Sequence, residues 1–181
     1  MIIDMGSGPQ PMEDADIHMD LLAYPHVEVL HDMLTVPYPF EDNFADVIYL
    51  HEVVEHISIF DINKVFSEVY RILKPGGYVE IIVPDLLWVM DKFSREDWAS
   101  LGSIRWLQKS PNIEKNVMRI IYGGSYDEPE KDKPTMRHIS GWTMNLIKES
   151  LLEAVAPEVW RRIERLENKK DVCNLLVQAT K

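Results

Sequence analysis

The sequence predicts an α/β domain on an open, mainly parallel sheet. Short apolar runs rich in Ile and Val, each broken by Gly, Pro or Asp, recur along the first half of the chain as buried strands do. Amphipathic stretches that are typical of helices stand between the later runs. Strands that alternate with helices favour a parallel sheet, and 181 residues suit one domain with its own core.

Seven segments are predicted as strands. The first five share apolar or alternating residues with a break directly after the run, and they span residues 1–5, 15–20, 26–32, 45–50 and 77–85. The last two, 159–167 and 172–180, are expected to close the sheet as an antiparallel pair.

Two helices have recognisable ends. Asp61 is the expected N-cap of a helix over residues 62–73, whose apolar side chains fall on one face. The run Lys74-Pro75-Gly76-Gly77 is a strong signal for the end of that helix. Thr143 is the expected cap of a second amphipathic helix, which runs to residue 155.

The composition excludes several classes of protein. A formal net charge of -11 argues against wrapping a nucleic acid, which needs a basic face. The single cysteine, Cys173, lies in an apolar run and is expected to pack in the core. No apolar run approaches the length of a membrane span, and no signal peptide is visible. We therefore expect a cytoplasmic protein with no nucleic-acid and no membrane partner.

The stretch "HEVVEH" (51–56) is a near miss to a zinc-binding motif. The pattern H-E-x-x-H needs a histidine at position 55, and the inverted pattern H-x-x-E-H needs one at position 52; this chain has Glu55 and Glu52. No third ligand is marked in the sequence, so we expect no metal. A zinc hydrolase remains as a hypothesis that would require stoichiometric zinc.

Polar residues follow the predicted strands where such sheets bind ligands. Glycines at positions 6 and 8, after the first strand, allow a ligand to approach the backbone closely. Asp20 can hold two ribose hydroxyls, Asp32 can accept from an exocyclic amine, and Met33 can pack on a purine. Together these residues predict a nucleoside-shaped slot lined by carboxylates.

The slot does not fit a dinucleotide. A third glycine is missing, because position 11 is Pro11, and Asp20 comes too soon for a full helix. No Lys or Arg precedes Lys64 to meet a phosphate. A cofactor with a positive charge and no phosphate, such as S-adenosyl-L-methionine, fits the acidic slot better.

Several segments resemble class I S-adenosylmethionine-dependent methyltransferases. They are "IIDMGSGP", Asp20, "HDMLTVPYPFEDNFADVIYLHEVVEH" and "EVYRILKPGGYVEIIVPD". The chain is most similar to small methyltransferase-like members whose first crossover helix is reduced to a loop. The resemblance covers residues 1–85, and "YGG" (122–124) with "HISGWT" (138–143) extends it. It implies a Rossmann-like doubly wound sheet, mostly parallel, with an antiparallel C-terminal strand pair.

The resemblance also implies a set of cofactor residues at the strand ends: Asp4, Gly6, Ser7, Gly8, Asp20, Asp32, Met33, Leu50 and His51. The first four would frame the methionine portion. Asp20 would take the ribose hydroxyls, Asp32 with Met33 the adenine, and the last two would lie near the transferred methyl. His51 would either take a proton from an acceptor hydroxyl or only shape the pocket, and both roles stay open.

An insert at about residues 86–142 is expected to form a cap on the acceptor side of a single domain spanning 1–181. Tyr122, Gly123 and His138 are its predicted substrate-binding residues, and His138 is a second candidate base. The polar stretch 125–135 is a predicted lid or a plain surface loop. Trp88, Trp98, Trp106 and Phe93 are expected in the core or on an exposed dimer face, with a substrate wall as the second reading.

These observations predict an S-adenosylmethionine-dependent methyltransferase that acts on a small-molecule acceptor. Protein acceptors stay open, as does the choice between oxygen, nitrogen and carbon methylation. The alternative is a catalytically silent methyltransferase fold that serves as a binding or partner subunit. A homodimer is kept open as a further partner.

Overall fold

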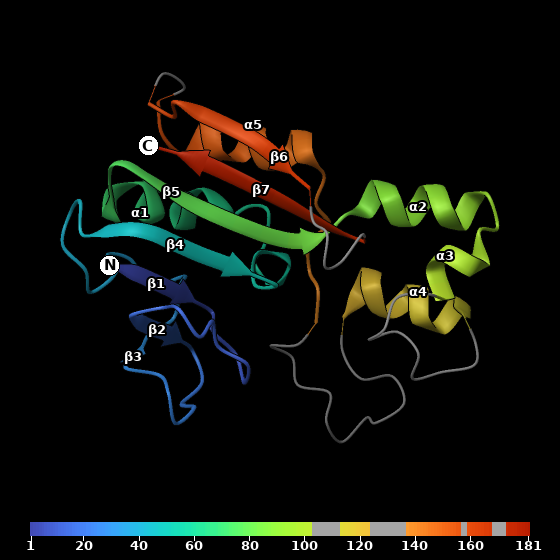
Figure 1. Cartoon of the computed structure of the whole chain (residues 1–181), viewed down its shortest axis with the longest axis horizontal. Helices are drawn as coiled ribbons and strands as arrows, with labels where there is room; N and C mark the ends of the chain where they lie inside the picture. The colour runs from blue at the N-terminus through green and yellow to red at the C-terminus, as the bar shows by residue number, and fades with distance from the viewer. Residues whose placement is uncertain (103–112, 124–136, 157–158, 168–172) are drawn as a thin grey trace.

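A computed structural model describes residues 1–102, 113–123, 137–156, 159–167 and 173–181. Within these ranges seven strands form one sheet in the order β3-β2-β1-β4-β5-β7-β6 (Figure 1). The strands are β1 (Ile2–Met5), β2 (Ile17–Asp20), β3 (Val29–Leu30), β4 (Ala45–His51), β5 (Leu73–Pro84), β6 (Arg162–Leu166) and β7 (Asn174–Thr180).

The sheet has the topology that the sequence predicts. Strands β1 to β5 pair in parallel, whereas β7 runs antiparallel to both β5 and β6. Strand β1 stands between the two halves of the parallel part of the sheet, with β2 and β3 on one side and β4 and β5 on the other. This confirms the Rossmann-like, mostly parallel sheet with an antiparallel C-terminal pair, and it places the topological switch between β1 and β4.

The largest shift in element bounds concerns β5, which begins at Leu73 and not at residue 77. Leu73 pairs with Ala45, and Tyr78 pairs with Val47, so residues 74–77 bulge out opposite a single residue of β4. Added to Gly77, a Cβ would lie 2.8 Å from the Asp46 carbonyl oxygen. The glycine-rich run that predicted a helix end is therefore a kink inside a strand, since it lets two backbones approach closely.

The helices are α1 (Ile62–Ile72), α2 (Leu86–Ser94), α3 (Trp98–Gly102), α4 (Ile113–Tyr122), α5 (Met144–Ala154) and the short 3₁₀ helix η1 (Val54–His56). Thr143 caps α5 as predicted, because its hydroxyl accepts from the amide of Leu146. Asp61 precedes α1, but its carboxylate makes no cap bond and instead accepts from Lys64 Nζ at 2.7 Å. The side-chain cap bond predicted for α1 is therefore absent, because the Asp61 carboxylate binds Lys64, one helical turn further along the chain.

Helices α1 and α5 lie on the same face of the sheet (Figure 1). Alternate side chains of the central strands, such as Ile48, Val79 and Val177, are fully buried against Phe66 of α1 and Leu151 of α5. Burying such side chains is worth about 1.5–3 kcal/mol each, so this face supplies the main core.

The opposite face of the sheet carries polar side chains. Asp4 pairs in register with Tyr49, Tyr49 with Glu80, and Glu80 with Gln178, so these four side chains follow one another across the strands. Glu80 and Gln178 are only half-buried. The crossovers at residues 6–16 and 21–28 contain no helix, which confirms the predicted short first crossover.

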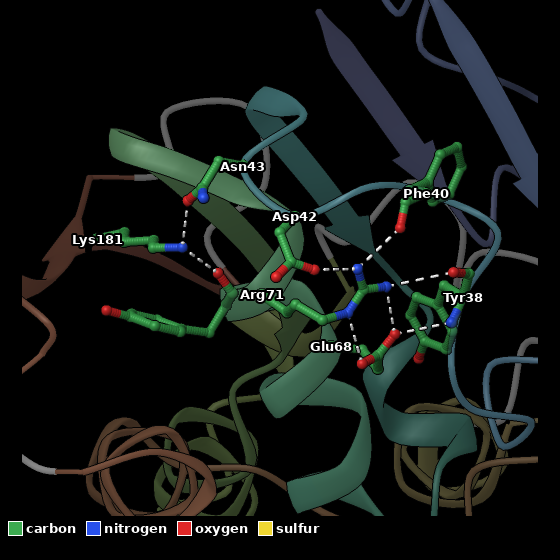
Figure 2. A network of polar contacts seen from close by, with 8 residues as sticks. Tyr38, Phe40, Asp42, Asn43, Glu68, Arg71 and Lys181 are labelled. Carbon is green, nitrogen blue, oxygen red and sulfur yellow. Dashed lines mark hydrogen bonds and ion pairs between the residues drawn. The ribbon is translucent and has the colours of Figure 1, made fainter.

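An arginine network ties the segment before β4 to α1 (Figure 2). The Arg71 guanidinium donates to both carboxylate oxygens of Glu68, at 2.9 and 2.7 Å, and to Asp42 at 2.8 Å. It also donates to the backbone carbonyls of Tyr38 and Phe40. One side chain thereby holds the loop that leads from the end of β3 into β4.

Helices α2, α3 and α4 form a second, smaller cluster beyond the end of β5 (Figure 1). Val89, Leu101 and Val117 are buried there together with Cys173, which confirms the packing role expected for the cysteine. Trp88 and Trp98 pack against this cluster, so their expected core role is confirmed as well. Trp106 lies outside the described residues. None of the described helices is long and apolar enough to cross a membrane.

Candidate functional site

The loop after β1 is shaped by two glycines with positive φ, +77° at Gly6 and +56° at Gly8. A Cβ on Gly6 would lie 2.4 Å from Cγ2 of Val53, whereas a Cβ on Gly8 would face nearly open space. The Gly6 amide donates to the carbonyl of Met19 in β2 at 2.7 Å. The loop therefore folds tightly over the sheet edge and leaves the backbone of Gly8 accessible from outside.

Two acidic residues hold this loop. Asp20, at the end of β2, accepts from the amides of Gly8 at 2.8 Å and Leu22 at 2.7 Å. Asp4 accepts from the amide of Met12 at 2.9 Å, and burial raises the pKa of its carboxyl. Since each carboxylate oxygen has a second lone pair, both groups can accept further hydrogen bonds from a ligand.

The remaining strand-end residues on this side differ in their exposure to solvent. Asp32 follows β3 and accepts from the amide of Leu34 at 2.8 Å, while its neighbour Met33 packs partly against the core. Ser7 is buried, and its hydroxyl lies 3.4 Å from Nε2 of His26. The structure thus brings the predicted residues from β1, β2 and β3 to one edge of the sheet.

His51 ends β4 and pairs with Glu80 of β5. Its Nε2 lies 2.9 Å from the Glu80 carboxylate, which can only accept, so Nε2 carries the hydrogen and Nδ1 keeps a free lone pair. Leu50 points the other way and is fully buried in the core, so only its backbone faces the strand ends.

The stretch "HEVVEH" is divided among three elements. His51 belongs to β4, Glu52 adopts a positive φ of +53°, and residues 54–56 form η1. The short helix η1 ends at His56, and α1 starts only at Ile62. The strained residue at position 52 turns the chain sharply, which directs Glu55 away from His51 and under the segment before α5.

A pocket of 220 Å³ opens at the end of β5, beside η1. Apolar side chains dominate its lining, with Leu86 and Val89 from α2, Ile120 and Ile121 from α4, and Trp142. The polar groups among the lining residues are Glu55, Tyr122, His138 and Ser140. A small apolar pocket with a few polar groups is the usual form of a small-ligand site.

Two of these polar groups are buried and face each other. His138 Nε2 lies 3.8 Å from Glu55 Oε1, and the imidazole rings of His138 and His56 are 5.0 Å apart. Burial, helped by the nearby Glu52 carboxylate, raises the pKa of Glu55 well above its ordinary value. Burial also lowers the pKa of His138 to about 4 and lowers that of His56, so both imidazoles are neutral at pH 7.

The structure describes three of the residues that were predicted on the acceptor side, Tyr122, Gly123 and His138. Tyr122 is half exposed and lines the pocket, and its carbonyl accepts from the amide of His138 at 2.9 Å. Gly123 pairs with Arg137 but does not line the pocket. Gly124 and the predicted lid at 125–135 lie outside the described residues. His51 is not among the residues that line this pocket, and its expected place near the transferred methyl stays a prediction.

Sequence reasoning missed Glu80, Glu55 and Trp142 as parts of the site. Glu80 lies in the middle of an apolar strand, and the alternation of "YVEIIVPD" was the signal that could have marked it as facing away from the core. Asp85, the acid that follows β5, caps α2 by accepting from the amide of Trp88, and its carboxylate binds Arg165 at 2.8 Å. Its role in the structure is therefore to fix elements.

Comparisons with known proteins agree with this geometry. A family model described as a methyltransferase domain matches residues 14–81. A methyltransferase structure from Archaeoglobus fulgidus, described as SAM-dependent, has a TM-score of 0.59 at 12% identity and covers 99% of this chain and 85% of that one. Residues 14–81 thus match a methyltransferase domain, and the chain has the Rossmann-like fold of S-adenosylmethionine-dependent methyltransferases.

Two further matches bear on this methyltransferase domain. The Burkholderia thailandensis 1,6-didemethyltoxoflavin-N1-methyltransferase, solved with its substrate and S-adenosylhomocysteine, has a TM-score of 0.56 at 13% identity over 99% of this chain and 70% of that one. The Caenorhabditis elegans phosphoethanolamine N-methyltransferase 2 is 46% identical over 44 residues. That match spans 24% of this chain and only 10% of the relative.

The methyl donor of this family is S-adenosyl-L-methionine, and the residues of the methyltransferase domain fit it. The Gly6–Gly8 turn leaves room that a Cβ would fill, and Asp4 and Asp20 offer carboxylates at the same edge. No Lys or Arg precedes Lys64 in the sequence, so the electrostatic potential at this edge suits a cationic ligand.

Proposed function

We propose that this methyltransferase domain transfers a methyl group to a small molecule bound in the pocket between β5, α2 and α4. The observation that carries the proposal is the position of two sites at the same edge of one sheet. The glycine loop held by Asp20 lies at the ends of β1 and β2, and the pocket lies at the end of β5, in the same sheet. A donor and an acceptor held at strand ends of one sheet can be aligned for direct transfer.

The residues proposed to hold the cofactor are those whose geometry fits its parts. Asp4 and the Gly6–Gly8 turn, including Ser7, would surround the methionine portion. Asp20 retains acceptor capacity for the ribose hydroxyls, and exposed Asp32 with half-buried Met33 can take the adenine. When bound, S-adenosyl-L-methionine supplies a methyl group already activated by its sulfonium.

We propose His51, at the end of β4, as the general base for a hydroxyl acceptor that extends from the pocket to that strand end. Glu80 holds the Nε2 hydrogen at 2.9 Å, which fixes the ring and leaves Nδ1 ready to accept a proton. His138 fits this role less well, because its Nδ1 donates to the carbonyl of Ile120 and its Nε2 faces buried Glu55. We therefore assign His138 and Tyr122 to the wall of the acceptor pocket.

The pocket and the charge support a small acceptor. Its 220 Å³ holds a compact molecule, and the apolar lining favours one with an apolar body. The net charge of -11 opposes a nucleic-acid acceptor. Two of the relatives bear the names of small-molecule methyltransferases, one for phosphoethanolamine and one for a toxoflavin precursor.

A silent partner subunit is the second candidate function. It is favoured by the polar face of the sheet, where Glu80 and Gln178 are half-exposed to the outside and no described helix packs. Such a face could contact another protein or a second copy of this chain. In that case the chain would bind cofactor without turnover, or would not bind it.

Isothermal titration with S-adenosylhomocysteine tests the proposal. We expect one binding site per chain, and we expect Asp20→Asn to weaken binding at least about tenfold, because it removes a charge-assisted hydrogen bond. Glu149→Gln, which removes an exposed carboxylate on α5, is the matched control and should bind like the wild type. If the wild-type chain shows no binding, the enzyme proposal is wrong. Binding with no transfer to any of a panel of small amines, phenols and thiols favours the partner subunit.

A further inference from the structure

Three potential metal ligands meet beside the acceptor pocket. Glu55 and His56 come from η1, and His138 comes from the segment that leads to α5. One ligand atom from each lies within 4.8 Å of the other two. The sequence marked no third ligand for "HEVVEH", because His138 is far away along the chain and only the fold brings it close.

The Glu55 carboxyl has no hydrogen-bond donor within reach among the described residues, and burial together with its acidic neighbour Glu52 raises its pKa. The residue is 1% exposed, and neither of its oxygens is bonded within the described part of the chain. The closest cationic or potentially cationic group is His138 Nε2 at 3.8 Å, which is too far for a hydrogen bond. A buried carboxylate without partners is costly, and a bound cation would satisfy both oxygens.

Both imidazoles are oriented as metal ligands usually are. His56 Nδ1 lies 3.0 Å from the carbonyl of Arg137, and His138 Nδ1 lies 2.8 Å from the carbonyl of Ile120. Because a carbonyl only accepts, each Nδ1 carries the hydrogen and each Nε2 presents a lone pair. A backbone carbonyl on the second ring nitrogen is the arrangement that fixes ligand histidines in metal proteins.

We propose that Glu55, His56 and His138 bind one divalent transition-metal ion of the zinc type. Two imidazole nitrogens and one carboxylate favour such an ion over Mg²⁺ or Ca²⁺, which prefer oxygen ligands. Ligand atoms around tetrahedral zinc lie about 3.4 Å apart at ordinary bond lengths. The 3.8 Å between Glu55 and His138 needs only a small inward movement to reach that spacing.

The ion would lie against the acceptor pocket, since Glu55 and His138 both line it. A three-ligand site keeps a coordination position for water or substrate. We infer that this position binds an oxygen or nitrogen of the acceptor and so orients it. This role rests on the proposed methyl transfer, whereas binding of the ion does not.

Metal binding is tested on the full chain, purified without a histidine tag and treated with EDTA. We expect ZnCl₂ to bind in titration calorimetry at one ion per chain, and mass spectrometry of the metal content to give the same ratio. Glu55→Gln and His138→Asn should each weaken zinc binding at least about tenfold, as ligand loss does. His31→Gln removes a histidine outside the three and should leave binding unchanged.

Three controls make the outcome decisive. Circular dichroism shows whether each variant is folded, and His56→Gln replaces any variant that is not. Cobalt absorption in the visible range should appear in the wild type and His31→Gln and disappear in the ligand variants. The proposal is overturned if zinc binds below stoichiometry, or if the ligand variants bind it as tightly as the wild type. Titration of the same samples with S-adenosylhomocysteine separates failure of the metal site from failure of the proposed methyltransferase activity.

Discussion

At the scale of single residues, the structure separates side chains that the sequence groups together. His51 and His56 stand in one six-residue stretch, yet the first pairs with Glu80 on the polar face of the sheet and the second packs on His138. The positive φ at Glu52 causes the separation, because it turns the chain directly after β4. The two histidines can therefore serve different chemistry.

The role of His51 can be tested by its substitution. We expect His51→Gln to lower kcat for a hydroxyl acceptor by about 100-fold or more, because a general base contributes on that order. Glu80→Gln should cause a smaller loss, since it weakens only the orientation of the imidazole. The measurement is the pH profile of kcat, in which the His51→Gln defect should shrink at high pH as the acceptor ionises unaided. A rise in KM with unchanged kcat would instead assign His51 to the pocket wall.

Gly6 offers a second test at this scale. Gly6→Ala forces a Cβ to within 2.4 Å of Val53 at a φ of +77°, so we expect a loss of about 2–4 kcal/mol in unfolding free energy. Binding of S-adenosylhomocysteine should be lost with it. Gly76→Ala is the matched control, because Gly76 has a φ of +85° but no atom within 4 Å of an added Cβ. Gly76→Ala should lower the unfolding free energy by about 1 kcal/mol and leave cofactor binding intact. Urea unfolding and calorimetry measure both quantities, and equal losses in the two variants would contradict the close contact.

At the scale of elements, strands and helices follow from local patterns more reliably than their ends do. The alternation in β5 and the apolar stripe of α1 are visible in the sequence, and both elements are where they were expected. The bounds of β5 were not predictable, because Leu73 extends the strand by pairing with Ala45 across a bulge. Asp61 is the N-cap residue of α1 as expected, but its missing side-chain cap bond was not predictable, since the choice of its carboxylate between backbone and Lys64 depends on three-dimensional contacts.

The Arg71 network makes a prediction for stability. Arg71→Met should lower the unfolding free energy by about 2–4 kcal/mol, because it leaves Glu68 and two backbone carbonyls without their donor. Arg95→Met is the control: its ion pair with Asp91 is exposed, so the cost should stay below about 1 kcal/mol. Urea denaturation of both variants checks the difference, and similar small costs would contradict a structural role for the network.

The same network sets a pH dependence. The hydrogen bond from Arg71 lowers the pKa of Glu68 below its ordinary value of 4.5. The unfolded chain therefore takes up a proton near pH 4.5 while the folded chain does not, so the stability from this pair is present above pH 4.5 and is lost as the pH falls through the folded pKa. Measured between pH 6 and pH 3, the stability difference between wild type and Arg71→Met should narrow. A difference that stays constant over this pH range would show that protonation of Glu68 does not govern the stability supplied by Arg71.

At the scale of the whole molecule, the fold class and one side of the site could be predicted from the sequence. The glycine loop, Asp20 and the succession of strands and helices along the chain follow from local signals that act over a few residues. The pocket could not be predicted, because Glu55, Trp142 and His138 meet only when the segment before α5 packs on η1 through the Glu55 carbonyl. The cap formed by residues 86–142 and the roles of the site residues remain predictions.

Ligand stabilisation tests the electrostatic character of the site as a whole. S-adenosylhomocysteine at 100 times its dissociation constant should stabilise the chain by about 2.7 kcal/mol, which raises the melting temperature by roughly 5–10 °C. ATP at the same concentration should give no shift, because the acidic edge repels phosphates and the first 63 residues contain no Lys or Arg. Thermal unfolding followed by circular dichroism gives both values. An equal shift with ATP would mean that the site accepts a phosphate-bearing nucleotide.

The central claim is that the glycine loop and the pocket are the two halves of one methyl-transfer site. A crystal structure of the chain with S-adenosylhomocysteine tests it most directly. We expect density for the cofactor along the Gly6–Gly8 turn, with the ribose hydroxyls on Asp20 and the sulfur facing the pocket lined by Glu55, His138 and Trp142. Cofactor bound with its sulfur turned away from that pocket, or bound at another surface, would contradict the account.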